Sequence, residues 1–521
     1  MQLTGDLLIA SEYRSAPDQF HGRNAASGAR LDPPFSIAGA ADVEDACAAA
    51  EAAQREYASR PLAERAAFLR ACAEEIDALG DTLTARAMAE SGLPEARLVG
   101  ERGRTVGQLR LFAAEVEDGG WQALRIDHAD PARTPPKPDL RLRMVPLGPV
   151  AVFGASNFPL AFSVAGGDTA AALAAGCCVV VKAHPAHPGT SELVAGAIAL
   201  AVEKTGMPKG VFSMVAGPAN ELGAALVADP RIAAVGFTGS RAGGTALMRI
   251  AAERTVPIPV YAEMSSINPV ILMPSKLAEQ AEALGAAYVG SLSLGAGQFC
   301  TNPGVVLAVE GDALDRFLAA AGEAIAGVAG QTMLTAGIHG AFVEGTERLA
   351  GLPGARLVAR GSAADTPCGE AQLYTVSASD FLAEPHFAEE VFGPVSVVVR
   401  CADIDELTHV LESMEGQLTA TLHLSPADHE AASMLIPLLE RKAGRIIANG
   451  WPTGVEVAHA MNHGGPYPAT SDGRSTSVGT LAIDRFLRPV AYQDMPESLL
   501  PDGLREAAAT GLRRVDGAWL T

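Results

Sequence analysis

One cysteine, Cys300, lies in a glycine-rich run whose residue types suit nucleophilic catalysis. The run reads GAGQFCTNPG over residues 295–304 and follows the mostly apolar run 286–294. Glycine permits positive φ and close approach of the backbone, so such a loop can present a thiol together with neighbouring N–H groups. A thiolate there would be a nucleophile beside an oxyanion site. The alternative is a small buried apolar residue, which is how most cysteines in a chain of this size act.

Two charged residues each stand at the end of a short apolar run. Lys182 follows the run VVV at 179–181, and Glu263 ends the run VYAE at 260–263. We expect both runs to be buried strands, where an unpaired charge is costly. The position of Glu263 therefore favours a functional role over that of a solvated surface charge.

The elements that must position these residues alternate between strands and helices. Apolar runs and helix-like segments alternate over residues 148–272, which predicts repeated βαβ units and a parallel, doubly wound α/β sheet with ligand sites at the carboxyl ends of its strands. The predicted strands are 150–153, 179–181, 211–215, 233–237, 260–261 and 270–272, and the predicted helices are 168–175, 190–204, 221–228 and 244–254. The G-x-G-x-x-G fingerprint is absent. A glycine-rich turn at 236–244 can hold a phosphate at a helix N-terminus instead.

The segments on either side of this block differ in character. Residues 41–112 have helical periodicity, and residues 273–480 form a second α/β block that contains Cys300. The proline-rich segment 121–142 leads into the alternating run LRLRM at 140–144, which predicts a half-exposed strand. Such a strand serves an interface or forms a surface hairpin, and the sequence leaves both open.

Bulk composition narrows the class of protein. A chain of 521 residues suggests two or three domains, and a net charge of −21 argues against nucleic acid or an anionic membrane as the main partner. The seven scattered cysteines include no CxxC, so we expect no disulfide framework and no zinc or other metal site. They also suit a reducing compartment.

The uncharged run 144–167 is interrupted by prolines and is typical of a strand, loop and helix, not of a membrane span. With no secretory signal at the start, we expect a cytoplasmic enzyme without membrane contact.

Six stretches in one order resemble the aldehyde dehydrogenase superfamily over almost the whole chain. Each motif is weak alone, whereas the ordered set is specific. The stretches are GASNFP (154–159), VKAHP (181–185), GFTGS (236–240), YAEM (261–264), GQFC (297–300) and EEVFGPV (389–395). The KAHP variant, the run CTNPG (300–304) and the ending 463–479 look closest to α-ketoglutaric semialdehyde (2,5-dioxovalerate) dehydrogenases, with a fatty-aldehyde branch as a near relative.

The resemblance implies catalytic roles for three residues. Cys300 would attack the aldehyde carbonyl to form a thiohemiacetal, and the Asn157 amide with the Cys300 backbone N–H would stabilise the oxyanion. Transfer of hydride to the nicotinamide leaves a thioester. Glu263 would activate the water that hydrolyses it. Taken alone, an asparagine in an apolar loop is usually an ordinary turn residue.

The resemblance also implies a dinucleotide site. Lys182 would bind the adenosine ribose, Gly239 and Ser240 the pyrophosphate, and Glu390 and Phe392 the nicotinamide ribose and ring. Many NAD-preferring relatives have a glutamate three residues after this lysine, where the present chain has Pro185. Without that carboxylate a 2′-phosphate is not repelled, so we expect NADP to be tolerated or preferred over NAD. The neighbours that could contact this phosphate, or only decorate a proline-rich loop, are His184, His187, Thr190 and Ser191.

The substrate pocket is the least defined part of the resemblance, because the chain departs from the usual family ending after residue 462. A distal carboxylate calls for arginine or hydroxyl groups, and by position we expect Arg474 and Ser475, with Thr476 and Ser477, to provide them unless they form a solvated loop. Phe158 and Phe299 flank the reacting atoms as tunnel walls or as ordinary core.

The expected architecture is an α/β protein with a Rossmann-like cofactor domain, an α/β catalytic domain and a small β extension for oligomerisation. The predicted boundaries are 1–123 and 146–263 for the NAD(P)-binding domain, 264–480 for the catalytic domain, and 124–145 with 481–521 for the extension. Such extensions pair subunits in the family, which implies a homodimer or homotetramer.

Three other functions remain to be weighed against oxidation of α-ketoglutaric semialdehyde. The nearest is oxidation of medium or long fatty aldehydes. A thiol hydrolase or acyltransferase would use Cys300 without a redox cofactor, but Lys182 and the 236–240 turn speak against it. A non-catalytic scaffold conflicts with the joint presence of Cys300, Glu263 and Asn157.

Overall fold

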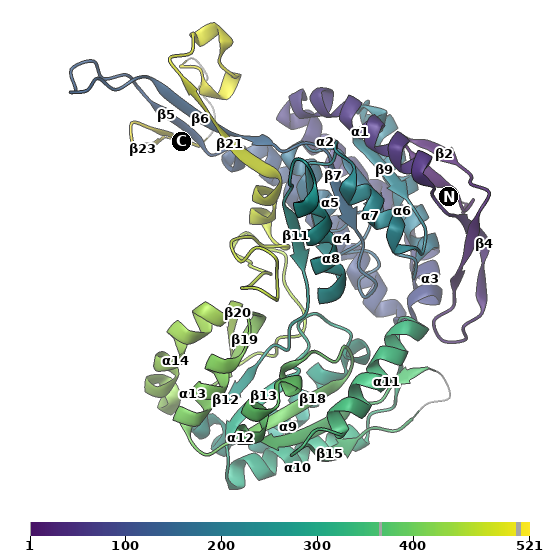
Figure 1. The fold of residues 1–521 in the computed structure, drawn as a ribbon, viewed down its shortest axis with the longest axis vertical. Coiled ribbons are helices and arrows are strands. Elements are labelled where there is room, and N and C mark those ends of the chain that lie inside the picture. Colours follow the sequence, from purple (N-terminus) through teal and green to yellow (C-terminus); the bar gives the residue numbers. More distant parts are fainter. Residues whose placement is uncertain (1, 364–366, 507–511, 521) are drawn as a thin grey trace.

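The computed structural model describes residues 2–363, 367–506 and 512–520. The chain forms two α/β lobes and a thin arm that projects from the first lobe (Figure 1). Each lobe is built on a seven-stranded sheet, and a five-stranded sheet forms the arm. The predicted α/β fold class is therefore confirmed.

The first sheet has the strand order β11-β10-β7-β8-β9-β1-β2, and β7 to β11 run parallel. Its strands are β1 (Leu7–Ile9), β2 (Glu12–Arg14), β7 (Val150–Phe153), β8 (Val179–Lys182), β9 (Phe212–Val215), β10 (Ala234–Thr238) and β11 (Val260–Glu263). The crossover helices are α5 (Gly167–Ala175), α6 (Pro188–Thr205), α7 (Asn220–Ala228) and α8 (Arg241–Glu253). The parallel strands β7 to β11 are largely buried on both faces, which explains their apolar runs.

Four N-terminal helices belong to this first lobe: α1 (Ala40–Ser59), α2 (Leu62–Ala78), α3 (Gly80–Ser91) and α4 (Glu95–Asp118). Their apolar faces join the core of the first sheet through side chains such as Tyr57, Phe68 and Phe112, all fully or almost fully buried. A separate hairpin of β3 (Gln19–Arg23) and β4 (Arg30–Ser36) lies beside them.

The second sheet has the order β15-β17-β18-β13-β12-β19-β20. Its strands are β12 (Val270–Leu272), β13 (Val305–Val309), β15 (Arg356–Arg360), β17 (Gln372–Ser377), β18 (Val395–Cys401), β19 (Gln417–His423) and β20 (Ala443–Ala448). The helices around it are α9 (Pro274–Ser293), α10 (Asp312–Ala326), α11 (Ala336–Ala350), α12 (Ala378–Ala383), α13 (Ile404–Ser413) and α14 (His429–Lys442). A small ladder of β14 (Gln331–Thr332) and β16 (Cys368–Gly369) lies apart from it.

The arm joins segments that are far apart in the sequence. Its strand order is β21-β6-β5-β22-β23, with β5 (Leu124–Asp127), β6 (Leu140–Pro146), β21 (Leu487–Gln493), β22 (Arg513–Val515) and β23 (Ala518–Leu520). Residues 507–511 and 521 of the predicted extension, like 1 and 364–366 elsewhere, lie outside the described residues. The division into three domains stays a prediction.

The predicted strands and helices of the first lobe begin and end within three residues of the observed ones. The strand at 270–272 differs in one respect, because it pairs with β13 and β19 of the second sheet although it directly follows the first-lobe strands in the chain. The chain therefore crosses between lobes just after Glu263, and the lobes meet beside that residue (Figure 1).

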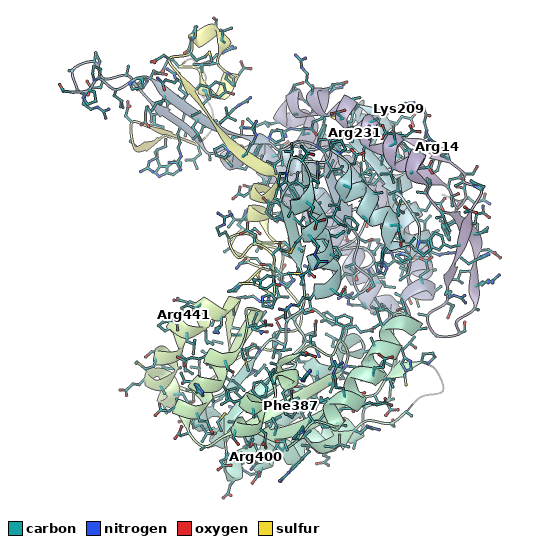
Figure 2. All side chains as sticks on the ribbon, viewed as in Figure 1. Arg14, Lys209, Arg231, Phe387, Arg400 and Arg441 are labelled. Carbon is teal, nitrogen blue, oxygen red and sulfur yellow. The ribbon has the colours of Figure 1, made fainter. Side chains whose placement is uncertain are left out.

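Basic side chains are spread over the outside of both lobes (Figure 2). Arg14 pairs with Asp45 at 2.6 Å, Arg231 with Glu44 at 2.7 Å and Arg400 with Asp315 at 2.9 Å. Within the described part of the chain, no helix is both long enough and apolar enough to span a membrane.

Candidate active site

The loop that carries Cys300 has a backbone that depends on its glycines. After α9 the chain forms a short 3₁₀ turn (Leu294–Gly297) in which three consecutive residues, beginning at Gly295, have φ between 57° and 65°. A Cβ atom at Gly297 would lie 2.4 Å from the backbone of Gly393, so only glycine fits there. The Cys300 carbonyl accepts a hydrogen bond of 2.9 Å from the Asn268 side chain. These contacts fix the half-buried thiol at the boundary between the lobes.

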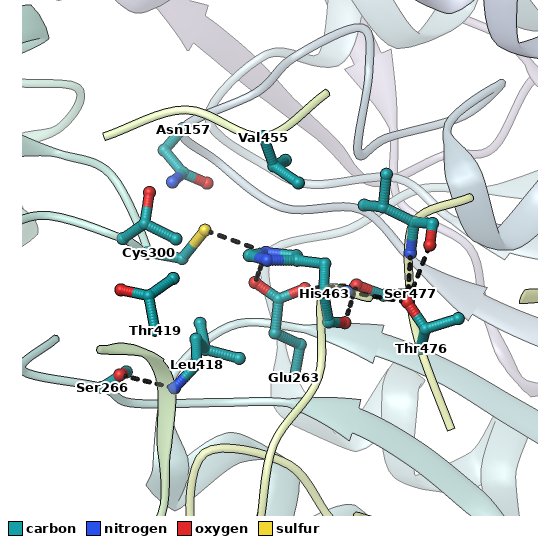
Figure 3. Close-up of polar contacts among 12 residues, drawn as sticks. Asn157, Glu263, Ser266, Cys300, Leu418, Thr419, Val455, His463, Thr476 and Ser477 are labelled. Carbon is teal, nitrogen blue, oxygen red and sulfur yellow. Dashed lines mark hydrogen bonds and ion pairs between the residues drawn. The ribbon is translucent and has the colours of Figure 1, made fainter. Parts of the chain in front are cut away.

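A buried histidine connects the cysteine to the glutamate. His463 Nε2 lies 3.3 Å from Cys300 Sγ and 2.9 Å from Glu263 Oε1 (Figure 3). The other carboxylate oxygen of Glu263 accepts a 2.7 Å hydrogen bond from Ser477 Oγ. With Glu263 ionised, Nε2 must carry a proton, because two acceptors would not approach to 2.9 Å. The same N–H then lies beside the sulfur.

The pKa values of the two reactive groups move in opposite directions. Burial opposes ionisation of Glu263, but the charge and hydrogen bond of His463, with the Ser477 hydroxyl, bring its pKa below the ordinary value. Burial raises the pKa of the Cys300 thiol well above its ordinary range, and the Glu263 charge raises it further. The resting site therefore holds a carboxylate beside a protonated thiol, and the carboxylate can receive the thiol proton.

His463 is a site residue that the sequence analysis did not single out. Residues 463–479 contributed to the resemblance only as a distinctive ending of the chain. In the structure this loop lies against β11: Met264 N–H donates to the Ala469 carbonyl at 2.8 Å, and Glu263 forms a backbone bridge with Thr470. Because 200 residues separate His463 from Glu263, no local spacing could reveal the pair.

Asn157 lies on the other side of Cys300 (Figure 3). Its amide nitrogen donates to the Gln298 carbonyl at 3.1 Å, so one amide N–H is used to hold the catalytic loop and the second remains for an oxyanion. Phe158 and Phe299 pack edge to face, with ring centroids 5.4 Å apart, in a small apolar cluster beside the thiol. The structure thus brings together Asn157, Cys300, Glu263 and the two aromatic residues.

Lys182 ends β8 at the carboxyl edge of the first sheet. Burial lowers its pKa to about 8, and no hydrogen bond or ion pair joins its ammonium group to any residue in the part of the chain that the structure describes. Pro185 follows in a half-buried turn. Three of the other candidates for a 2′-phosphate are buried and engaged: His187 with the Ala155 carbonyl at 2.9 Å, Thr190 with Glu90 at 2.8 Å, and Ser191 with the His187 carbonyl at 2.9 Å. His184 stacks on His187 and is only half-buried.

The glycine-rich turn ends β10 and begins α8. Ser240 is the N-cap residue, and its hydroxyl accepts from the Gly243 N–H at 3.2 Å. A Cβ atom at Gly239 would lie 2.8 Å from the Phe237 ring, so the turn has no room for a side chain there. An exposed helix N-terminus with free N–H groups suits a pyrophosphate.

Glu390 and Phe392 belong to the second lobe and line one hollow together with Phe299. Burial raises the pKa of Glu390 to about 7, partly offset by hydrogen bonds from Ser265 and Ser266. The hollow lies beside the catalytic loop, where a nicotinamide ring must meet a carbon bound to Cys300.

Arg474 and Ser475 have partners other than a substrate. The Arg474 side chain is 91% exposed and pairs with Asp472 at 3.1 Å. Ser475 donates to the Asp472 carbonyl at 3.1 Å. Nothing in these contacts supports the predicted carboxylate site, whereas their neighbour Ser477 reaches Glu263.

The chain belongs to the aldehyde dehydrogenase family, since residues 34–477 match the model of the Aldehyde dehydrogenase family. It is therefore an NAD(P)-dependent oxidoreductase, as the sequence motifs predicted.

Two relatives and two solved structures are similar to this chain over nearly its full length. The chain is 59% identical over 519 residues to alpha-ketoglutaric semialdehyde dehydrogenase 2 of Azospirillum brasilense, covering 99% of each chain. It is 47% identical over 491 residues to alpha-ketoglutaric semialdehyde dehydrogenase of Acinetobacter baylyi, covering 94% of this chain and 93% of that one. Among solved structures it resembles the aldehyde dehydrogenase KauB from Pseudomonas aeruginosa, with a TM-score of 0.80 and 22% identity over 95% of this chain and 97% of that one. A mutant of aldehyde dehydrogenase C from Pseudomonas syringae, complexed with NAD+ and octanal, has a TM-score of 0.79 and 21% identity over 94% and 97% of the two chains.

Proposed function

We propose that the protein oxidises α-ketoglutaric semialdehyde to α-ketoglutarate with NAD(P) as the hydride acceptor. The observation that carries the proposal is the contact of one histidine nitrogen with both Cys300 Sγ and Glu263 Oε1, in a chain that is 59% identical to a semialdehyde dehydrogenase over nearly its full length. A nucleophile, a base and an N–H donor thus meet at one point.

The first step is formation of the thiolate. Glu263 is ionised and close enough to receive the thiol proton, and the His463 N–H then donates to the sulfur anion. The thiolate forms a bond to the aldehyde carbon, and the carbonyl electron pair moves to oxygen. The free N–H of Asn157 and the backbone N–H of Cys300 stabilise that oxyanion.

Hydride leaves the tetrahedral carbon, and a thioester remains on Cys300. NAD(P) supplies the acceptor for this hydride when bound. Glu263, after losing its proton to solvent, takes a proton from a water molecule that attacks the thioester. The acid is released, and the sulfur leaves as a thiolate that the His463 N–H again stabilises. The presence of Glu263 favours water over coenzyme A as the acyl acceptor.

The residues present fit a dinucleotide. Lys182 has a half-buried ammonium group without a hydrogen-bond or ion-pair partner in the described part of the chain, and Ser240 begins a helix whose first N–H groups are open to a pyrophosphate. With Pro185 in place of a carboxylate, Lys182 can hold either ribose hydroxyls or a 2′-phosphate, so we propose that NADP is accepted at least as well as NAD. Of the four neighbours considered for the phosphate, His184 is the half-buried one. Its Nδ1 accepts the Ala186 N–H at 3.2 Å, and its Nε2 has no hydrogen-bond partner within the described residues.

We also propose an oligomeric state, a division into domains and a location for the protein. The arm of β5, β6 and β21 to β23 would pair subunits in a homodimer or homotetramer. The three predicted domains would correspond to the three larger sheets. We also expect a cytoplasmic location, because the scattered cysteines without a CxxC pattern suit a reducing compartment.

A second candidate is a medium- or long-chain aldehyde dehydrogenase. It is favoured by the aromatic cluster of Phe158, Phe162 and Phe299 beside the thiol.

To separate the two candidates, nicotinamide reduction by the purified enzyme is measured with α-ketoglutaric semialdehyde and with unbranched aldehydes of increasing length, each with NAD and NADP. The Cys300→Ala variant serves as the control. A higher kcat/KM for the semialdehyde than for every unbranched aldehyde supports the proposal, and a kcat/KM that rises with chain length replaces it by the second candidate. No reduction with any aldehyde, despite a titratable Cys300 thiol, would leave a cofactor-independent thiol enzyme.

A further inference from the structure

Two arginines from different lobes approach the catalytic loop. Arg104 comes from α4 of the first lobe, and Arg445 comes from β20 of the second. Both bind the irregular segment 452–455: Arg104 Nη1 donates to the Val455 carbonyl at 2.6 Å, and Arg445 Nη2 donates to the carbonyls of Pro452 and Gly454 at 2.9 Å each.

The segment between the two arginines is attached to the catalytic loop. Gly454 N–H donates to the hydroxyl of Thr301 at 3.1 Å, and Thr301 follows the nucleophile directly. Val455 packs against the apolar cluster that contains Phe158, Phe162 and Phe299. The guanidinium of Arg104 also lies over the Phe162 ring, 5.3 Å from its centroid. Both arginines therefore lie around the apolar pocket beside the thiol.

Neither guanidinium is satisfied by the protein. Arg104 Nε, Arg104 Nη2 and Arg445 Nε are buried and have no hydrogen-bond partner among the described residues. No carboxylate of the described chain forms an ion pair with either arginine, although the charges of Glu101 and Glu456 act on Arg104 from farther away. Buried donors of this kind are rare in native proteins and call for a partner.

The electrostatics point the same way. Burial lowers the pKa of both arginines, and the charge of Arg104 lowers the pKa of Arg445 further. Two like charges that lie within reach of one another, and of Cys300, form a positive field on one side of the nucleophile. An anion placed between them would relieve both the repulsion and the missing hydrogen bonds.

We propose that Arg104 and Arg445 together bind the far carboxylate of the substrate while its aldehyde carbon lies at Cys300. The proposal rests on the proposed semialdehyde dehydrogenase function and names the residues that recognise this substrate class. Guanidinium groups match a carboxylate with paired N–H donors. Rotation of the long arginine side chains opens their buried nitrogens to the ligand, as is common when a ligand binds.

A third arginine shows what a satisfied guanidinium looks like in the same pocket. Arg97 lies over Phe158 at 4.5 Å and Phe299 at 5.2 Å, but it is ion-paired with the buried Glu101. Glu101 also accepts the N–H groups of Leu160 and Ala161 at 2.9 and 3.0 Å, which ties this pair to the first lobe. Arg97 therefore has a structural partner, and the carboxylate is left to Arg104 and Arg445.

The test compares two five-carbon aldehydes, α-ketoglutaric semialdehyde and pentanal, with wild type, Arg104→Met and Arg445→Met. Methionine keeps most of the side-chain length and removes the donors. We expect each variant to lose about 10- to 100-fold in kcat/KM for the semialdehyde, mainly through KM, and much less for pentanal. Arg110→Met, an exposed position on the same helix, is the matched control.

A second readout needs no turnover. Without NAD(P), α-ketoglutarate should slow the alkylation of Cys300 by iodoacetamide in wild type and in Arg110→Met, and this protection should disappear in Arg104→Met and Arg445→Met. Unchanged protection and unchanged selectivity in both variants, with a wild type that prefers the semialdehyde, would overturn the arginine site and leave the proposed function intact. Equal losses for both aldehydes would also overturn it, because the arginines would then act on the fold or on Cys300. A wild type that prefers pentanal would overturn both proposals.

Discussion

The pocket contains two groups of buried polar side chains that differ in how far the protein satisfies them. Around Glu263, both carboxylate oxygens have donors, from His463 and Ser477, and Nδ1 of His463 is the atom of these three side chains that lacks a partner among the described residues. Around Arg104 and Arg445, three buried nitrogens have no partner among the described residues. A satisfied group is organised before a ligand arrives, which suits chemistry that must recur in each turnover. An unsatisfied group is completed by a ligand, which suits recognition.

The largest expected effect comes from removing the nucleophile Cys300, which lies beside the satisfied carboxylate of Glu263. Cys300→Ala should lower kcat by about 10⁴-fold or more, because no covalent intermediate can form. Aldehyde-dependent nicotinamide reduction measures the rate. A titration of NADP binding should be unchanged within about twofold, which separates lost chemistry from a lost fold. Substantial residual turnover would mean that the carbonyl is attacked by another group.

The next effect separates the two halves of the reaction. Glu263→Gln keeps one oxygen that can accept from His463 or from Ser477 but removes the base. We expect the steady-state rate to fall by about 10²- to 10⁴-fold. Up to one equivalent of reduced cofactor should form as the thioester accumulates, and this burst should be faster at high pH, where the Cys300 thiol ionises without a base. Stopped-flow absorbance measures the burst, and Glu389→Gln, an exposed neighbour of Glu390, is the control. An unchanged steady-state rate in Glu263→Gln would show that Glu263 is not the base that activates water.

These two groups also mark what the sequence could and could not predict. Glu263 and Lys182 end strands whose apolar runs are clear in the sequence, and Cys300 lies in a glycine-rich run. Local patterns and the ordered motifs therefore singled out these three residues as candidates. The first-lobe strands were found for the same reason, because burial on both faces leaves an unbroken apolar signal.

The residues that were missed depend on contacts between lobes. His463 is 163 residues from Cys300, and Arg104 and Arg445 meet the same short segment from opposite ends of the chain. Position in the sequence suggested Arg474 for the carboxylate, whereas that side chain is 91% exposed and paired with Asp472. Whether an arginine is buried with unpartnered nitrogens or exposed and ion-paired depends on the fold around it, and the sequence alone does not show this.

A smaller effect is expected from the donor between nucleophile and base. His463→Gln removes the ring N–H that faces Cys300 Sγ at 3.3 Å, so kcat/KM should fall by about 10- to 100-fold. The pH at which iodoacetamide alkylates Cys300 at half its maximal rate should rise, because the thiolate loses a donor. His459→Gln, in the same loop but with a side chain that is 70% exposed, should leave both quantities unchanged. An unaltered alkylation profile in His463→Gln would assign the histidine to packing alone.

The smallest effect concerns a third polar group, Lys182, whose ammonium group has no hydrogen-bond or ion-pair partner among the described residues. Its pKa is lowered to about 8 by burial, so the free enzyme loses this positive charge as the pH rises through 8. A bound 2′-phosphate favours the protonated form and raises the pKa in the complex. The Kd for NADP should therefore be level below pH 8 and rise by up to about tenfold per pH unit above it, until the pKa of the complex is reached.

NAD offers only ribose hydroxyls to Lys182, so its Kd should change less over the same range, and Lys182→Arg should abolish the rise for NADP because guanidinium keeps its charge. Fluorescence titration of both cofactors between pH 6.5 and 9.5 measures the two curves. Parallel curves for NAD and NADP would mean that the charge of Lys182 does not reach the 2′ position. In that case an unsatisfied buried cation in this protein does not by itself identify the group it binds, and the assignment of Arg104 and Arg445 would depend on their variants alone.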